Sequence, residues 1–375
     1  MIGLEQERPE DPVESMAEDT PTPETAQGAI VEIRKIPDLP KGFYNAAAWK
    51  ANGEPDSPTL LLGRQPEKPG ARGKPDTGSL QLVVLNKDNE VVSIKEMWRP
   101  EGLREGDQLE DVRAIVTPNG DVILGCTRLV FNSIADMYEP FPAVAITSSE
   151  ALLRGEFPDT NLIEIFGSGR QTTPIGNGAN RFHLLPGKNA TPLEPNKFMF
   201  RREGDSHRMT VFSRDEVGRV KELPALVFPK NQIPAWGADM IGTTMPPVWL
   251  DKTKKEALFL PHGFKLVEGK PKYALGSARL FFGEDGEYAV DNISEEPLLT
   301  PEMLAALFPG EQVQLHPELR DALYMSGGTP VFDSTGNLER VYGYPSVGDS
   351  RTLEAIINVH EITRNWKRPE LAAAA

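Results

Sequence analysis

A short acidic motif followed by an arginine is the part of this sequence best suited to chemistry. Residues 110–113 read Glu-Asp-Val-Arg and lead directly into the apolar run Ala-Ile-Val at 114–116. In an extended strand Asp111 and Arg113 face the same side, so the guanidinium could hold the carboxylate in place for proton transfer. A surface ion pair at the start of a strand is the alternative, and for a single motif it is the more common case.

Other polar residues also stand at the ends of apolar runs. Arg64 ends the run Leu-Leu-Leu-Gly that begins at residue 60, His262 follows Leu-Phe-Leu-Pro, and Asp349 precedes a β-type run. Two prolines, at 246 and 247, precede the strand that leads to His262, which is typical of a rim loop over a cavity. The alternative is a loop whose histidine caps a neighbouring carbonyl group.

Several common catalytic patterns are absent. The five histidines include no pair at helical spacing, which excludes a zinc-hydrolase motif. Ser346 does not match the Gly-x-Ser-x-Gly pattern of a nucleophilic serine. The single cysteine, Cys126, excludes a disulfide framework and a cysteine-based zinc site. We therefore expect no metal site and no cofactor.

The charge balance narrows the class of partner. The 375 residues carry 40 Lys and Arg against 55 Asp and Glu, a net charge of −15, which argues against nucleic-acid binding. No apolar stretch approaches the length of a membrane span, and the start of the chain does not resemble a secretory signal. We expect a soluble, cytoplasmic protein without a membrane partner.

The elements that must position these residues are β-strands. Apolar and polar residues alternate over 30–33 and 80–85, and less regularly over 121–126. Pairs such as Asn52-Gly53 and Asn119-Gly120 supply the turns between them. A strand–turn–strand unit recurs near residues 43–64, 112–127, 181–202, 246–262 and 325–344. This repeat predicts an all-β, five-bladed β-propeller, although a double β-domain is the alternative.

The two ends of the chain differ from this pattern. Residues 5–24 contain eight acidic residues, one base and four prolines, so we expect 1–28 to be a disordered acidic tail. The propeller would occupy 29–368, and 369–375 would be a C-terminal tail. One helix is predicted from a capping Thr300 and Pro301 to about Phe308, and a second near 369–373.

Taken in order, the polar motifs resemble glycoside hydrolase family 130, the five-bladed propellers that hydrolyse or phosphorolyse β-mannosides. The resemblance covers roughly residues 40 to 358. It is carried by these pieces: Asn45, Leu62-Gly63-Arg64, Glu110-Asp111-Val112-Arg113, Asn180-Arg181, Arg201-Arg202, Gly242-x-x-x-Pro246-Pro247, His262-Gly263, Tyr273-x-Leu275-Gly276, and Tyr342-Gly343 with Asp349.

The resemblance implies an inverting mechanism in which Asp111 is the acid that delivers a proton towards the glycosidic oxygen. Inversion places the nucleophile on the face opposite the leaving group. A phosphorylase uses phosphate, which is already anionic, whereas a hydrolase uses water and needs a carboxylate base. We expect sugar binding by Asn45, Arg64, Arg113, Trp249, His262 and Asp349. The resemblance implies that Arg64 and Asp349 hold the hydroxyl groups of the mannosyl unit, whereas Trp249 either stacks on a sugar face or is ordinary packing at a strand start.

A phosphate site would decide between the two reactions. The matching residues are Arg181, Arg201, Arg202 and Tyr273, of which Arg181 replaces the usual lysine. Trp249 stands where phosphorylases have a lysine after the proline pair, and Phe182 stands where they have an aspartate. Loss of one cation from a buried dianion site removes a contact of roughly 1.5–3 kcal/mol. Phosphorolysis and hydrolysis both stay open.

Hydrolysis would require a base, for which Asp239, Glu203 and Asp205 are candidates. Aromatic residues at 44, 49 and 236 could stack on sugar, although core packing is the commoner fate of such residues. The expected partners are an oligosaccharide and, in a phosphorylase, inorganic phosphate; a homo-oligomer is left open. Two other function classes are a non-catalytic carbohydrate-binding propeller, suggested by Trp249 and Phe182, and a protein-interaction propeller that binds no sugar.

Overall fold

The structure, a computed structural model, is built almost entirely from antiparallel strands. It describes residues 28–68, 77–98, 108–132, 137–157, 163–164, 187–202, 206–214, 220–251, 253, 255–282, 287–308, 322–348, 351–364 and 366. Within these ranges there are five four-stranded sheets and one three-stranded sheet. The predicted all-β class is therefore confirmed.

The first three sheets follow the chain in order, each strand pairing with the next. The first contains β2 (Tyr44–Lys50), β3 (Thr59–Lys68), β4 (Thr77–Leu85) and β5 (Val91–Trp98). The second contains β6 (Gln108–Val116), β7 (Asp121–Asn132), β8 (Met137–Ser148) and β9 (Ile163–Glu164). The third contains β10 (Gly187–Glu194), β11 (Lys197–Arg202), β12 (Arg208–Arg214) and β13 (Val220–Val227).

The fourth sheet is bent and carries the extra three-stranded sheet. It contains β15 (Val248–Trp249), β16 (Glu256–Phe259), β19 (Ala278–Phe282) and β20 (Tyr288–Asp291). The three-stranded sheet contains β14 (Met240–Gly242), β17 (His262–Val267) and β18 (Lys270–Leu275). Only two residues separate β16 from β17, and two separate β18 from β19. The small sheet thus continues the middle hairpin of the fourth sheet, an extension that the sequence analysis did not predict.

The last sheet joins the two ends of the chain. It contains β21 (Leu323–Phe332), β22 (Leu338–Val347), β23 (Arg351–Asn358) and, paired with β23, the first strand β1 (Ile30–Lys35). An ion pair between the half-buried Arg34 and the buried Glu354 lies across this pairing. Because the first strand completes the last sheet, the ring is closed by hydrogen bonds.

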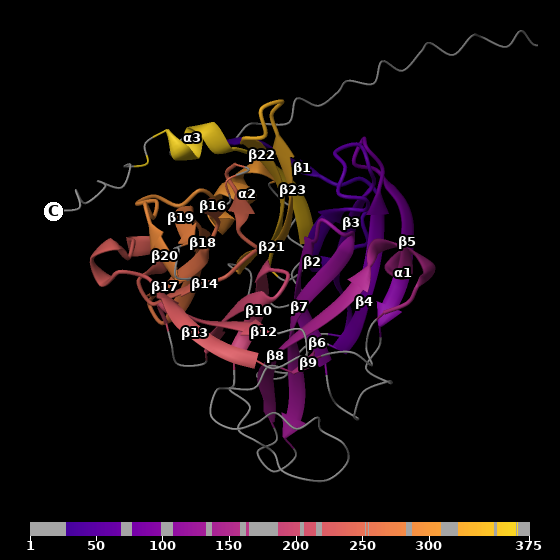
Figure 1. Cartoon of the computed structure of the whole chain (residues 1–375), viewed down its shortest axis with the longest axis horizontal. Coiled ribbons are helices and arrows are strands. Elements are labelled where there is room, and N and C mark those ends of the chain that lie inside the picture. Colours follow the sequence, from indigo (N-terminus) through magenta and orange to yellow (C-terminus); the bar gives the residue numbers. More distant parts are fainter. Residues whose placement is uncertain are drawn as a thin grey trace, which may run out of the picture.

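The sheets are arranged around the middle of the molecule (Figure 1). Strand β2 contacts both β6 and β21, β10 contacts β6, β13 contacts β20, and β18 contacts β21, which completes a ring. Two glycines allow neighbouring sheets to approach closely. A Cβ on Gly327 of β21 would lie 2.2 Å from the Ala48 nitrogen of β2, and a Cβ on Gly125 of β7 would lie 2.2 Å from the Ala190 oxygen of β10. This arrangement is the predicted propeller, and the five four-stranded sheets match its predicted blades.

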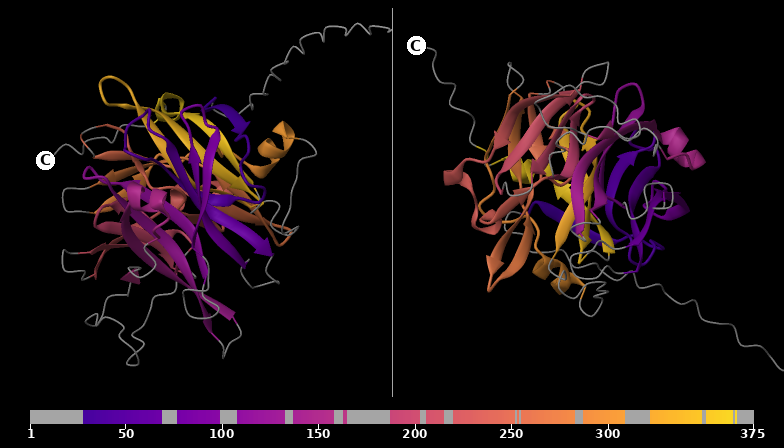
Figure 2. Two further views of the ribbon diagram at one scale, coloured as in Figure 1. Left: turned by 90° about the vertical axis from the view of Figure 1, so that its right-hand side faces the viewer. Right: turned by 90° about the horizontal axis from the view of Figure 1, so that it is seen from below.

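The apolar core lies between neighbouring sheets. One cluster joins the first and second sheets, another joins the third and fourth, and a third joins the small sheet to the last one. Few helices cover the ring (Figure 2). These are α1 (Ser149–Arg154), α2 (Pro301–Leu307), α3 (Val359–Thr363) and the short 3₁₀ helices η3 (Lys230–Gln232) and η4 (Ala235–Gly237).

Most local predictions that fall on described residues are confirmed. All three alternating runs are strands, and α2 has Thr300 as its cap and Pro301 as its first residue. Gly53 and Gly120 adopt positive φ angles in their turns. No helix in the described ranges is long and apolar enough to span a membrane. The predicted tails, apart from Gly28, and the second predicted helix lie outside the described residues.

Candidate active site

Asp111 and Asn45 face each other from neighbouring sheets because both strands bulge there. The pairing of β2 with β3 slips around Asn45, and the pairing of β6 with β7 slips around Asp111. Both residues have left-handed backbones, with φ of 52° and 56°, a conformation that Asn and Asp tolerate better than most residues. The Asn45 Nδ2 donates a hydrogen bond of 2.9 Å to the Asp111 Oδ1.

Arg113 fixes the backbone on which Asp111 stands. Its side chain is buried, and it donates to the main-chain oxygens of Asp111, Thr243 and Thr244. Burial lowers the pKa of Arg113, while the charges of Asp111 and Glu110 act in the opposite direction. The guanidinium was expected to hold the Asp111 carboxylate, and it binds the carbonyl oxygen instead. The carboxylate therefore stays available on its bulge.

An ion pair lies beside this group. The Arg64 Nη1 is 3.3 Å from the Glu110 Oε2, and the two side chains are 9% and 12% exposed. The Arg64 guanidinium also lies 5.5 Å from the centre of the Tyr44 ring. Because Glu110 precedes Asp111, this pair brings Arg64 next to the proposed acid.

His262 is a neutral imidazole among cations. Burial, followed by the nearby charges of Arg113 and Arg201, lowers its pKa to about 3. Its Nδ1 is buried without a hydrogen-bond partner, and its ring lies 5.4 Å from that of Tyr324 and 6.4 Å from that of Tyr273. At residue 242 only glycine leaves room for the ring, because a Cβ there would lie 2.7 Å from the His262 Cε1.

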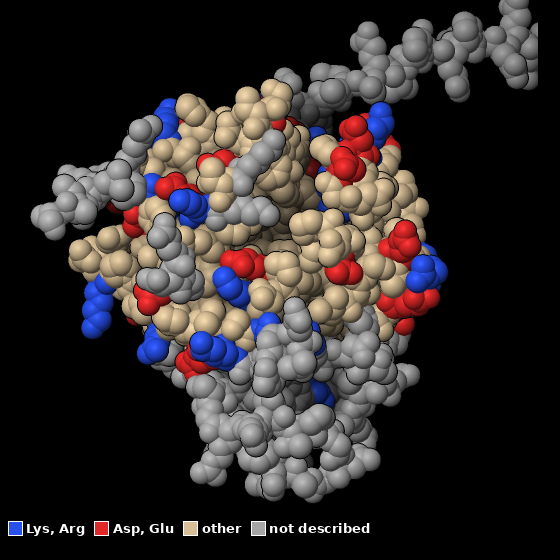
Figure 3. All heavy atoms as spheres, in the orientation of Figure 1, with Lys and Arg blue, Asp and Glu red and all other residues tan. Residues whose placement is uncertain are grey.

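Arg201 brings a second cation from the third sheet. Its Nε is buried and has no hydrogen-bond partner among the described residues. A buried hydrogen bond of 2.9 Å between the Thr191 and Thr243 hydroxyl groups ties the same sheet to the segment that Arg113 binds. Buried donors without partners are costly unless a ligand or water satisfies them. The face in Figure 3 is hollowed near its middle, with acidic and basic side chains beside the hollow.

The structure thus brings together seven of the residues singled out in the sequence: Asn45, Arg64, Asp111, Arg113, Arg201, His262 and Tyr273. Two others, Arg181 and Asp349, lie outside the described residues, as does the side chain of Arg202. Trp249 is half-buried, and its ring packs on Phe282, with centroids 4.0 Å apart, beside the core of the fourth sheet. Its sugar-binding role stays a prediction.

The other candidates can also be placed. Asp239 is exposed, and its Oδ2 accepts a 2.6 Å hydrogen bond from the Leu266 nitrogen; Glu203 and Asp205 lie outside the described residues. Trp49 and Trp236 are buried, and each indole nitrogen donates at 3.0 Å to a protein oxygen. Core packing, the commoner fate noted for these two aromatic residues, is the one observed.

Several members of the group were not predicted. Thr243 and Thr244 contribute main-chain oxygens, and no side-chain pattern reveals such a contribution. Tyr324 lies against His262, yet in sequence it is an ordinary aromatic residue near a strand start. Ser346 accepts a 2.8 Å hydrogen bond from the Asn45 nitrogen. The sequence analysis considered Ser346 only as a nucleophile and not as a hydrogen-bond acceptor for the main chain of Asn45.

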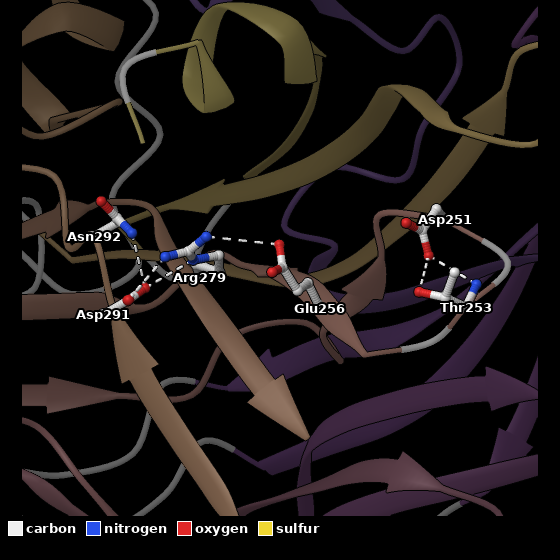
Figure 4. Close-up of polar contacts among 6 residues, drawn as sticks. All are labelled: Asp251, Thr253, Glu256, Arg279, Asp291 and Asn292. Atoms are coloured by element: carbon white, nitrogen blue, oxygen red, sulfur yellow. Dashed lines mark hydrogen bonds and ion pairs between the residues drawn. The ribbon is translucent and has the colours of Figure 1, made fainter. Parts of the chain in front are cut away.

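A second polar cluster lies in the fourth sheet (Figure 4). Arg279, whose side chain is 4% exposed, donates to both oxygens of Asp291 at 2.9 Å, and its Nη1 is 3.7 Å from Glu256. The Asn292 Nδ2 donates to the Asp291 Oδ1 at 2.9 Å. Because the protein itself supplies carboxylate partners for this guanidinium, we interpret the cluster as a structural ion pair.

Solved structures share this architecture. A glycosyl hydrolase from Bacteroides ovatus matches over 92% of this chain and 92% of its own, with 13% identity and a TM-score of 0.56. The β-1,2-mannobiose phosphorylase from Listeria innocua, in complex with β-1,2-mannobiose, matches over 88% of this chain and 96% of its own, with 15% identity and a TM-score of 0.51. No family model matches the sequence, and no curated protein matches it. At these identities, the comparisons show that the chain shares the fold of these two enzymes.

Proposed function

We propose that this protein is an inverting enzyme that cleaves β-mannoside-like oligosaccharides, with Asp111 as the acid. The supporting observation is a carboxyl group that two bulged strands present beside buried cations. Asn45 orients one carboxylate oxygen, and Arg113 fixes the main chain below it. Arg64, paired with Glu110, provides donors for the hydroxyl groups of the sugar next to the cleaved bond.

The nucleophile that this site favours is inorganic phosphate. Arg201 holds a buried nitrogen without a hydrogen-bond partner, and the neutral His262 beside it offers a second nitrogen without one. A phosphate oxygen can accept from the Arg201 Nε–H. Because the other ring nitrogen of the neutral His262 donates to the main chain of Thr243, its Nδ1 is an acceptor and can bind the hydroxyl group of a phosphate ion. Among the carboxylates considered as a base for water, the described one, Asp239, is exposed and already accepts a hydrogen bond. Phosphorolysis needs no such base.

The test is incubation of the protein with β-1,4- and β-1,2-mannobiose, with and without phosphate. Phosphorolysis predicts mannose 1-phosphate in the α configuration, formed only when phosphate is present. Release of mannose alone in both buffers would replace phosphorolysis with hydrolysis. Release of neither product from these or other β-mannosides would contradict the proposed enzyme.

The second candidate function is a binding propeller without catalysis. It rests on the two departures at the phosphate positions: Trp249, which packs on Phe282, and Phe182, which lies outside the described residues. Calorimetry with mannobiose separates it from the enzyme. Heat of binding without any product in either buffer would favour the binding protein.

A further inference from the structure

The backbone of Asn45 is held by the last sheet of the ring. Because β2 bulges at this residue, its N–H group is not part of the ladder with β3. It donates instead to the Ser346 Oγ on β22, at 2.8 Å and fully buried. The two residues are 301 positions apart in the chain.

The Ser346 hydroxyl group belongs to a chain of hydrogen bonds in which the donor and acceptor of each bond can be assigned. Thr352, which faces Ser346 across the β22–β23 pair, donates its proton to the Phe43 carbonyl oxygen at 3.0 Å. A hydroxyl group has one proton to donate, so the 3.1 Å contact between the two hydroxyl groups must run from Ser346 to Thr352. The relay therefore leads from the Asn45 N–H through two hydroxyl groups to the carbonyl of Phe43.

One end of this relay, Asn45, lies on β2, the other, Phe43, directly precedes that strand, and both hydroxyl groups come from the last sheet. Ser346 is 0% exposed and Thr352 is 2% exposed, so water cannot readily replace either partner. The relay satisfies the Asn45 N–H, which the bulge leaves out of the ladder, and the Phe43 carbonyl, which precedes the strand. It thereby stabilises the left-handed conformation of Asn45, which costs free energy in an ordinary strand.

We propose that Ser346 and Thr352 are positioning residues for Asp111, which act by holding Asn45 in its left-handed conformation. Without the relay, Asn45 returns to an extended backbone, because that conformation has the lower intrinsic energy. Its side-chain amide then turns away from the Asp111 carboxylate, which it now contacts at 2.9 Å. The catalytic part of this inference rests on the proposed role of Asp111 as the acid.

The test compares Thr352→Val with Thr352→Ser. Valine keeps the shape of threonine and removes the hydroxyl group, whereas serine keeps the hydroxyl group and removes a methyl group. We expect Thr352→Val to lower kcat by roughly tenfold to a hundredfold, as expected for a displaced reacting group, with little change in KM. Thr352→Ser should retain most of the kcat. Equal losses in both variants would indicate packing and overturn the proposal.

Ser346→Ala provides a second route if the valine variant does not fold. It removes the same relay at its other hydroxyl group and leaves only a small space. Calorimetry with mannobiose measures the fraction of each preparation that binds sugar, and kcat is expressed per binding-competent molecule. A loss that disappears after this correction would show a purely structural role and contradict the proposal.

Crystal structures of the wild type and of both Thr352 variants test the relay without any activity. We expect Asn45 to lose its positive φ and its contact with Asp111 in Thr352→Val, and to keep both in Thr352→Ser. If the wild type cleaves no β-mannoside in either buffer, the proposed function fails and these structures still judge the relay. Unchanged Asn45 geometry in Thr352→Val would refute it.

Discussion

Two arginines with buried guanidinium nitrogens have opposite surroundings. Arg279 in the fourth sheet donates to both oxygens of Asp291 and lies 4.3 Å from the centre of the Phe281 ring. Arg201 in the third sheet keeps a buried Nε without a hydrogen-bond partner, beside a histidine with the same deficiency. The protein supplies hydrogen-bond acceptors for Arg279, whereas the Arg201 Nε can still donate to a bound ligand.

Whether a buried arginine nitrogen has a protein partner distinguishes a structural cluster from a ligand site better than its burial or its charge does. A buried polar group without a hydrogen-bond partner destabilises the folded protein by about 1–3 kcal/mol. We expect such a group where it binds a ligand. The left-handed backbones of Asn45 and Asp111 add strain to the same region. By contrast, the Arg279 cluster has carboxylate partners for its cation and needs no ligand. Variants of the two regions should therefore fail in different ways.

The largest expected effect is on catalysis by Asp111→Asn. Removal of a general acid lowers rates by roughly 10²- to 10⁴-fold, while asparagine fits the left-handed backbone and should leave the melting temperature almost unchanged. Steady-state assays with mannobiose and thermal melts measure the two quantities. The matched control is Asp38→Asn, since Asp38 is exposed and has a similar φ of 58°. Wild-type turnover by Asp111→Asn would remove the proposed acid.

Asp291→Ala should produce the reverse pattern. It leaves Arg279 buried without its main partner, so we expect the free energy of unfolding to fall by about 3 kcal/mol, while kcat per folded molecule stays unchanged. Urea denaturation at neutral pH measures the loss. The control is Glu156→Ala, which breaks an equally bidentate but exposed pair with Arg154 and should have no measurable effect. Similar stabilities of the two variants would contradict the comparison.

Arg201→Met tests whether the open cation serves an anion. Loss of one charge-assisted contact should weaken phosphate binding by about tenfold to a hundredfold. The KM for phosphate and the rise in melting temperature that phosphate causes both report this binding. Arg208→Met, at an exposed position on the neighbouring strand β12, should leave both values unchanged. Equal phosphate effects in wild type and Arg201→Met would place the anion elsewhere.

The smallest effect concerns the pH dependence of stability. In the unfolded chain a histidine takes up a proton below about pH 6.5, whereas burial lowers the pKa of His262 in the folded protein to about 3. Between these values the unfolded state binds the extra proton, so stability falls as the pH is lowered, by about 1.4 kcal/mol per pH unit.

His262→Gln should flatten this slope between pH 6.5 and 5, as measured by urea denaturation at several pH values. The exposed His360 provides the control, and His360→Gln should keep the wild-type slope. Identical slopes for the wild type and His262→Gln would show that the buried histidine accepts a proton as readily as a free one.

The architecture of this protein could be predicted because it depends on local signals. Alternating residues, Asn-Gly turns and the capped helix at Thr300 each fix a short segment, and the repeated hairpin indicates the ring. The three-stranded sheet was missed for a related reason. Pro261 and Gly276 stand where strands normally end, yet here the chain bends and continues into β17 and out of β18.

The sequence indicated several residues of the candidate site, but it did not indicate which atoms of these residues contact one another. Alternation places Asp111 and Arg113 on the same side of a strand, and the bulge between them changes that geometry. Main-chain partners such as Thr243 O leave no trace in residue types. The contact of Trp249 with Phe282 could not be predicted either, because a tryptophan at a strand start can face a core or a cleft.

The pairing of β1 with β23 can form only late in the synthesis of the chain. A nascent chain carries Asn45, Asp111 and Arg113 long before the ribosome adds β22 and β23. Until those last strands leave the exit tunnel, the ring is open and no hydroxyl group reaches the Asn45 nitrogen. Catalytic competence, on the proposed function, therefore arrives as a single late event and not strand by strand.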